Sequence, residues 1–277
     1  MDWDDYEYWG KKIAEWGASY HKSLRDLPVR SQVSPGQVSK SIPAFAPEEP
    51  EDVSQIMADF DQFILPGMTH WQHPRFFAYF PSNAAPPSIL ADFLSATLSS
   101  QGILWQMSPA ATELETSMME WMRDAVGLPS EFSGVIQDSA STATLAAVLT
   151  MRELVLNWKG NKDGLSGHNR LRIYVSGEAH SSVEKAVWIA GIGSENIVRL
   201  PVIGPMRGTD PDALKAAVES DIAAGFTPAG VVGVIGGTGI GACDDLDRMI
   251  AVAKEFNLYV HVDAAWAGSA AAAAMPK

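Results

Sequence analysis

The second half of the chain alternates short apolar runs with segments whose apolar positions recur every three or four residues. The apolar runs predict strands over 134–137, 171–176, 197–200, 231–235 and 258–263. The longer segments between them predict helices over 142–157, 182–190, 211–224 and 245–256. Regular alternation of strand and helix is typical of a mostly parallel sheet covered by helices on both faces. The pattern therefore predicts the α/β class.

The first part of the chain has a different pattern. Apolar residues at helical spacing over 1–27 predict an amphipathic helix: Tyr6, Trp9, Ile13, Trp16, Tyr20, Leu24 and Leu27. This helix either packs on its own core or serves as a dimer arm whose aromatic side chains are buried against a partner. Five prolines over 28–50 predict an extended connector, and 51–65 reads as a second amphipathic helix. Ser108 and Pro109 open another helix, which ends at Gly127. We expect a helical segment and connector over 1–80 and an α/β domain over 81–277.

The charge balance excludes several partners. Twenty Lys and Arg against 33 Asp and Glu give a net charge of −13, which repels nucleic-acid phosphate and anionic lipid. The single cysteine, Cys243, excludes intramolecular disulfides and fits a reducing cytoplasm. The N-terminus is acidic where a secretory signal is basic, and the uncharged stretch 222–243 is too rich in glycine for a membrane span. We predict a cytoplasmic protein that binds neither nucleic acid nor membrane.

Polar clusters follow the predicted strands at 138–142, 176–182, 236–239 and 261–263. In parallel sheets, ligands bind at the carboxyl ends of the strands. The convergence of four clusters at such ends therefore predicts a ligand site.

Three of these clusters allow a functional and a structural interpretation. The segment 139–142 places hydroxyls at a helix N-terminus, which suits a phosphate group, but Ser141 or Thr142 could equally be a simple N-cap. Asp263 ends an apolar strand, so its carboxylate favours a cation such as a protonated pyridine nitrogen, unless it caps the next segment. His180 precedes a helix and could stack on a flat ligand or transfer protons, although a loop histidine is often structural.

Other chemistries are less well supported. The strand 231–235, the glycines at 237 and 239 and Asp263 approximate a dinucleotide fingerprint. Asp244, Asp245 and Asp247, however, crowd the helix start and would repel a diphosphate. His70 and His73, or His261 and Asp263, supply two metal ligands without a third at fixed spacing, so we predict no metal site. The G-x-S-x-G motif of a hydrolase elbow is missing from the sequence.

The same residues resemble a known family. The sequence is similar to the group II pyridoxal-phosphate decarboxylases, in particular the aromatic-L-amino-acid decarboxylases. Five blocks carry the resemblance in the family's order: 69–81 (THWQHPRFFAYFP), 108–115 (SPAATELE), 134–145 (GVIQDSASTATL), 179–186 (AHSSVEKA) and 261–269 (HVDAAWAGS).

The resemblance implies a fold and an activity. The fold would be the large domain of a fold type I, aspartate aminotransferase-like transferase, incomplete here and preceded by a helical arm. The activity would be decarboxylation of an aromatic L-amino acid to its amine and carbon dioxide, with pyridoxal 5'-phosphate (PLP) as cofactor, in a homodimer.

The resemblance also implies site residues. Ala140 and Ser141, with Ser139 beside them, match the phosphate-binding turn. His180 matches the histidine that stacks on the pyridine ring, and Asp263 the aspartate that pairs with the ring nitrogen; these two are the expected catalytic residues. Further positions are implied for the cofactor at Thr238 and Ser82, for the substrate pocket at Trp71, Tyr79 and Phe80, and for the wall of the partner subunit's site at Ile103.

The sequence departs from the family pattern at several points. Gly-Gly-Thr-Gly at 236–239 stands where the family often has Gly-Thr-Thr-Thr, and Trp266 stands where it usually has a smaller or different residue. After Ala270 the sequence no longer follows the family pattern. The lysine that links the family's cofactor lies beyond the His-x-Asp block, and Lys277 lacks its context. We therefore expect the N-terminal part of a decarboxylase, inactive by itself. The alternatives are a remnant that at most dimerises or binds the cofactor weakly and, third, a dinucleotide-binding oxidoreductase.

Overall fold

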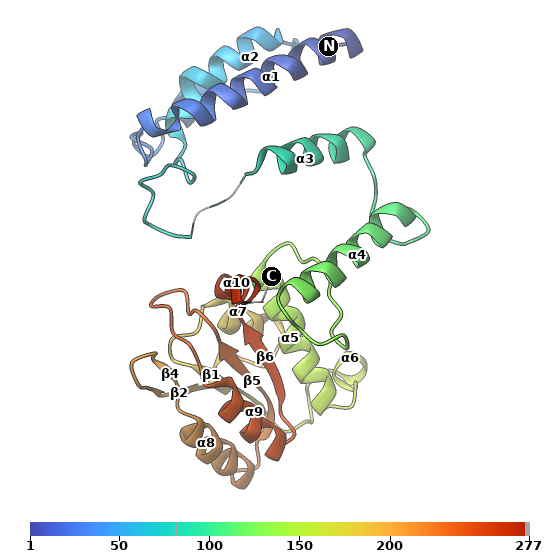
Figure 1. Ribbon diagram of the computed structural model, residues 1–277, viewed down its shortest axis with the longest axis vertical. Coiled ribbons are helices and arrows are strands. Elements are labelled where there is room, and N and C mark those ends of the chain that lie inside the picture. The colour runs from blue at the N-terminus through green and yellow to red at the C-terminus, as the bar shows by residue number, and fades with distance from the viewer. Residues whose placement is uncertain (81, 83, 275–277) are drawn as a thin grey trace. The chain divides into compact units, whose positions relative to one another are not determined.

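The computed structural model describes residues 1–80, 82 and 84–274 (Figure 1). The chain forms two compact units, Met1–Ser100 and Gln101–Lys277, and each is described by itself. The domain boundary predicted between residues 80 and 81 concerns the domains implied by the family resemblance, and it stays a prediction.

The C-terminal unit is built on a parallel sheet of four strands. They are β1 (Leu171–Ser176), β2 (Ile197–Leu200), β5 (Thr227–Val234) and β6 (Tyr259–Asp263), in the order β2-β1-β5-β6. The apolar runs predicted all four strands, and β5 begins earlier than expected. Their residues are apolar on both faces because helices cover both sides.

Two cores lie on opposite faces of the sheet. On one face, α5 (Ala140–Val155) and α7 (Ser182–Ile189) bury Met151 and Val187 against Val232 and other strand residues. On the other face, α8 (Pro211–Ala223) and α9 (Leu246–Glu255) bury Leu214 and Met249 against Tyr174 and Val231. These four helices were predicted, with ends that differ by one or two residues.

The strand order contains a point where the direction of the connections reverses. From β1 the chain crosses to β2 on one side, whereas from β5 it crosses to β6 on the other side. The connections therefore diverge between β1 and β5, and sheets of this type bind ligands outside the carboxyl ends of the strands at such a point.

The strand predicted over 134–137 does not form. No strand of the described residues pairs with it, and the Ile136 N–H donates to the Glu115 carboxylate (N···Oε1 2.9 Å) instead of to a sheet. Glu115 lies on α4 (Pro109–Ala125), a helix that the sequence predicted. An apolar run predicts a strand only where a neighbouring strand is present to pair with it.

Several short elements were not expected. They include an antiparallel hairpin of β3 (Val202–Ile203) and β4 (Gly208–Thr209), helix α6 (Gly160–Asp163), the 3-10 turns Ser194–Asn196 and Ala267–Ser269, and α10 (Ala270–Ala274). The hairpin follows β2 and becomes important for the site below.

The N-terminal unit is helical. Helix α1 (Trp3–Ser23) begins with a capping box between Asp2 and Asp5 and continues into a 3-10 turn. Its predicted aromatic stripe packs within the unit: Trp16 stacks on Tyr20 with ring centroids 5.4 Å apart and donates to Asp61 (Nε1···Oδ1 3.0 Å). These contacts favour a helix on its own core; the dimer arm stays a prediction.

The other elements of this unit are short. Helix α2 (Val53–Asp59) continues as a π-helical turn (Phe60–Ile64) and a 3-10 turn (Leu65–Gly67), and α3 (Pro86–Leu98) was not predicted. The 3-10 turn that follows α1 spans Leu24–Asp26, and another spans Ser39–Ser41. Across the part of the chain that the structure describes, none of the helices has the length and apolar character needed to cross a bilayer.

Gly230 is predicted to be essential for packing between β5 and α5. A Cβ at this position would lie 2.6 Å from Met151 Sδ and 2.9 Å from the Tyr259 carbonyl oxygen. We expect Gly230→Ala to lower the free energy of unfolding by about 1–3 kcal/mol, as overpacked cores do, measured by urea denaturation. The control is Gly239→Ala, where the Cβ would enter open space. Equal stability of the two variants would contradict the prediction.

Candidate functional site

Three of the predicted site residues lie at one edge of the sheet. His180 follows β1, Thr238 follows β5, and Asp263 is the last residue of β6. Because the three strands are parallel, their carboxyl ends share that edge. The register pairs Val234 with Asp263, and the next amide along β5, that of Ile235, donates to the Asp263 carbonyl (N···O 2.9 Å).

The N-terminus of α5 is capped by Ser139. Its hydroxyl oxygen lies 3.3 Å from the Thr142 nitrogen, from which it accepts a hydrogen bond. The structural interpretation expected Ser141 or Thr142 as the N-cap; the cap is instead Ser139, because the helix begins at Ala140 and already includes both of those residues. Ala140 opens the helix, and both Ser139 and Ser141 are exposed. The first amides of a helix have no partner within it, so this end of a 16-residue helix can also accept an anion.

His180 has a defined orientation. Its Nδ1 accepts from the Ser182 N–H (3.2 Å) and lies 2.9 Å from the Ser182 hydroxyl oxygen. The neutral ring therefore carries its proton on Nε2. The ring is exposed although Ser182 is buried, so Ser182 holds a side chain that presents its edge and faces to solvent.

Asp263 is half-buried and makes one side-chain hydrogen bond, from the Ala265 N–H to Oδ1 (3.2 Å). This bond is a local turn contact, which agrees with the structural interpretation. Among the described residues, no Lys, Arg or His forms an ion pair with this carboxylate. A partly desolvated carboxylate without a cation favours a positively charged ligand group.

His261 lies two residues before Asp263 and therefore on the same face of β6. Its Nε2 is buried without a hydrogen-bond partner in the described structure. Burial lowers the pKa of His261, and the nearby Asp263 carboxylate opposes part of that shift. Spacing alone suggested this histidine only as a metal ligand; its burial beside Asp263 follows from the tertiary structure.

The loop that carries Thr238 is closed by its own backbone. The Gly236 and Gly237 N–H groups both donate to the Ala242 carbonyl at 2.8 Å, and Thr238 is exposed. Gly236 has φ +78°, and a Cβ there would collide with the Ala267 side chain and lie 2.9 Å from Trp266 Cε2. Glycine is therefore needed at 236.

This loop does not suit a dinucleotide. Of the two fingerprint glycines, Gly237 already donates its amide to the Ala242 carbonyl, and Asp245 caps α9 by accepting from the Arg248 N–H (Oδ1···N 3.2 Å). Asp244 directly precedes the N-cap residue Asp245 and so lies beside the helix start, as the sequence suggested. It is buried and accepts from the Thr209 and Val234 amides, both at 2.6 Å.

The predicted substrate-pocket residues are divided between the two units. Trp71 and Tyr79 belong to the N-terminal unit, where their rings stack with centroids 5.6 Å apart. Trp71 and Ser82 both line a pocket of about 1110 Å³ in this unit, together with residues of α1 and α3. Phe80 is 45% exposed in the same unit, and Ile103 is 72% exposed in the C-terminal unit.

The described residues do not bring together the set of ligands that a metal ion requires. In the stretches 1–80, 82 and 84–274, no three His, Cys, Asp or Glu side chains gather as ligands for one ion. Tyr20 OH lies 2.7 Å from His70 Nδ1, and His73 Nε2 lies 3.2 Å from the Arg25 carbonyl. This histidine pair therefore makes packing contacts within the N-terminal unit.

Comparison with known proteins places the chain. Residues 35–275 match the pyridoxal-dependent decarboxylase conserved domain. The chain is 37% identical over 277 residues to tryptophan decarboxylase 2 of Oryza sativa subsp. japonica and 39% identical over 277 residues to phenylacetaldehyde synthase of Arabidopsis thaliana. It also resembles the crystal structure of Oryza sativa TDC with PLP and tryptamine, with a TM-score of 0.92 at 33% identity.

The chain belongs to the pyridoxal-dependent decarboxylase family. The alignments cover 98% of this chain and 55% and 56% of the rice and Arabidopsis relatives, and 60% of the rice TDC chain. The chain thus spans little more than half the length of these relatives. The likeness to solved decarboxylases confirms the α/β fold expected from the resemblance.

The half-buried His261 side chain makes the free energy of unfolding depend on pH. Because its folded-state pKa is lowered, the unfolded chain binds the proton more readily below the ordinary histidine pKa of about 6.5. We expect this contribution to stability to be complete above about pH 6.5 and to decline as the pH falls toward the folded-state pKa. Urea unfolding across this range measures it.

The control for this prediction is His261→Gln, in which the decline is expected to be smaller. Burial also lowers the pKa of His70, but that contribution is the same in both proteins. Identical pH profiles for the two proteins would contradict the prediction.

Proposed function

We propose that the protein takes part in the PLP-dependent decarboxylation of an aromatic L-amino acid to its amine and carbon dioxide. The observation that carries the proposal is the half-buried Asp263 carboxylate, which has no cationic partner among the described residues and shares a sheet edge with His180 and Thr238. Family membership and the solved relative with PLP support it.

The residues at this edge fit the cofactor chemically. Asp263 would hold a proton on the pyridine nitrogen, because an adjacent carboxylate favours the charged form of that nitrogen. The exposed imidazole of His180, oriented by Ser182, would stack on the ring. The amides of Ala140 and Ser141 with the hydroxyls of Ser139 and Ser141 would bind the phosphate. When bound, PLP supplies an electron sink for the carbanion left by loss of carbon dioxide.

The substrate side of the proposal rests on the aromatic residues. Trp71, Tyr79 and Phe80 would form the wall against the substrate ring, Ser82 would contact the cofactor, and Ile103 would line the site of the partner subunit in a homodimer. Stacked Trp71 and Tyr79 rings offer the flat apolar surface that an aromatic amino acid prefers.

Cofactor binding tests the assignment of Asp263. We expect Asp263→Ala to weaken PLP affinity by about 10–100-fold, since a hydrogen bond to a charged group contributes roughly 1.5–3 kcal/mol. The measurement is PLP titration followed by absorbance. Asp247→Ala is the matched control, because Asp247 is an exposed carboxylate in the first turn of α9. Equal affinities of the two variants would refute the role of Asp263.

Product analysis tests the activity itself. We expect the 277-residue chain to bind PLP but to show no turnover above background with tryptophan, tyrosine or phenylalanine, because none of its lysines is assigned the cofactor-linking role. The measurement is carbon dioxide release together with amine and aldehyde detection. Amine formation at an enzymatic rate would contradict this expectation, because it would mean that a lysine of these 277 residues links the cofactor. Absence of PLP binding would favour the remnant, and NADH binding the oxidoreductase.

A further inference from the structure

The β3–β4 hairpin contacts the loops that follow β1 and β5. The Cys243 N–H donates to the Met206 carbonyl at the hairpin tip (3.1 Å), and Asp244 accepts from Thr209 on β4 (2.6 Å). Gly208 is packed so tightly that a Cβ would lie 2.6 Å from the Cys243 carbonyl oxygen. The hairpin is therefore fixed to the segment that ends the Thr238 loop.

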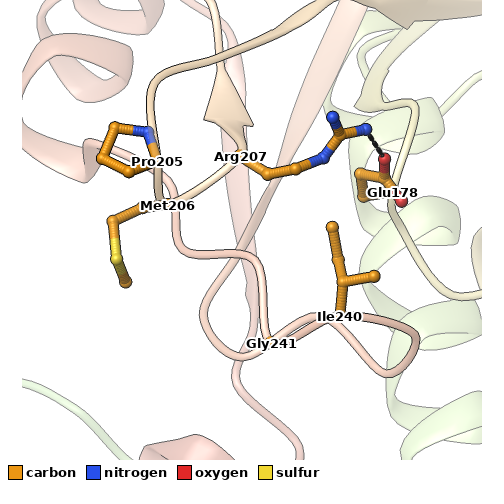
Figure 2. A pocket seen from close by; sticks show the side chains of 6 residues that line it. All are labelled: Glu178, Pro205, Met206, Arg207, Ile240 and Gly241. Carbon is orange, nitrogen blue, oxygen red and sulfur yellow. Dashed lines mark hydrogen bonds and ion pairs between the residues drawn. The ribbon is translucent and has the colours of Figure 1, made fainter.

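Arg207 has a backbone conformation in this hairpin that is energetically unfavourable for a residue with a side chain. Its φ is +50°, in the left-handed region that glycine adopts most readily, and its N–H donates to the Gly204 carbonyl (3.2 Å). A non-glycine residue persists there only when the surrounding structure supports it. Figure 2 shows the support: the guanidinium reaches across to the Glu178 carboxylate and forms an ion pair with it.

Glu178 lies on the loop that carries His180. Its own N–H donates to the buried Ser176 hydroxyl (3.1 Å), and its carbonyl oxygen approaches Gly237, where a Cβ would be 3.4 Å away. Arg207 and Glu178 line a pocket of about 470 Å³ together with Ile240 and Gly241 of the Thr238 loop (Figure 2). The hairpin, the His180 loop and the Thr238 loop thus meet around one ion pair.

We propose that the Arg207–Glu178 ion pair is a positioning contact that sets the separation of the His180 and Thr238 loops, so that both can contact one flat cofactor. The inference rests on the proposed function, but it concerns residues to which that function assigns no contact with cofactor or substrate. Asp244 anchors one end of this connection through its bonds to β4 and β5, and Arg207 closes the other end. We call these contacts the hairpin clip.

Hydrogen exchange of the cofactor-free chain tests the hairpin clip directly. Arg207→Gly removes the guanidinium while relieving the left-handed backbone, so the melting temperature is expected to stay equal or rise. In this variant and in Glu178→Gln, we expect amide exchange to accelerate about fivefold at Gly236, Gly237 and Cys243 and over 177–181. The acceleration is modest because an exposed ion pair contributes little free energy. Unchanged exchange would overturn the hairpin clip.

The chain offers a matched control. Arg199 on β2 pairs with Glu184 on α7 at 2.9 Å, with side-chain exposures of 51% and 35%, comparable to the 55% and 26% of Arg207 and Glu178. Arg199→Gln should leave exchange in both loops unchanged. The charge reversal Glu178→Arg with Arg207→Glu should bring it back toward wild type. Equal acceleration in the control would assign the effect to net charge and overturn the inference.

PLP titration of the same variants connects the hairpin clip to the cofactor. We expect Arg207→Gly and Glu178→Gln to bind PLP about three- to tenfold more weakly, with a reduced circular dichroism of the bound cofactor that reports a less ordered ring. Accelerated exchange with unchanged affinity and dichroism would refute the positioning role. If the wild-type chain binds no PLP, the proposed function fails and the link to the cofactor fails with it; the exchange result separately decides whether the hairpin clip holds the loops together.

Discussion

The parallel pairing of β1, β5 and β6 is the constraint on which the candidate site depends. Because all three strands run in the same direction, every polar residue that follows a strand lies at the same edge. Residues as distant in sequence as His180 and Asp263 therefore share that edge. The pairing itself is stabilised by two buried cores, so the geometry of the site is a consequence of apolar packing on both faces.

The loops at this edge are held by groups that perform no chemistry. Ser182 orients His180, Ala242 accepts two glycine amides beside Thr238, and Asp244 joins β4 to β5. A buried carboxylate such as Asp244 is favourable only when its oxygens accept hydrogen bonds, and both oxygens do so at 2.6 Å. The Asp263 carboxylate, by contrast, accepts one local hydrogen bond, from the Ala265 N–H, and can therefore bind a further partner.

Much of the fold was predictable from the sequence. All four strands of the sheet, and the helices that cover it, followed from periodicity, because burial on one or two faces dictates where apolar residues recur. The segment 134–137 was predicted wrongly as a strand, since its apolar residues have no adjacent strand to pair with. Helix α3 and the β3–β4 hairpin were missed. The hairpin strands have two residues each, too few to show a period.

For the site, the sequence alone determined which residues carry suitable chemistry, and that His180 and Thr238 follow strands and Asp263 ends one. It also identified the serines at the start of α5, although the strand expected before them does not form. Local chemistry explains this, because hydroxyls, imidazole and carboxylate are recognisable wherever they occur. Only the tertiary structure decided that the Asp244 carboxylate beside the helix start is buried and accepts two backbone N–H groups, that His261 is half-buried next to Asp263, and that Arg207 reaches Glu178. These properties depend on burial and on contacts between segments distant in the chain, which no local pattern encodes.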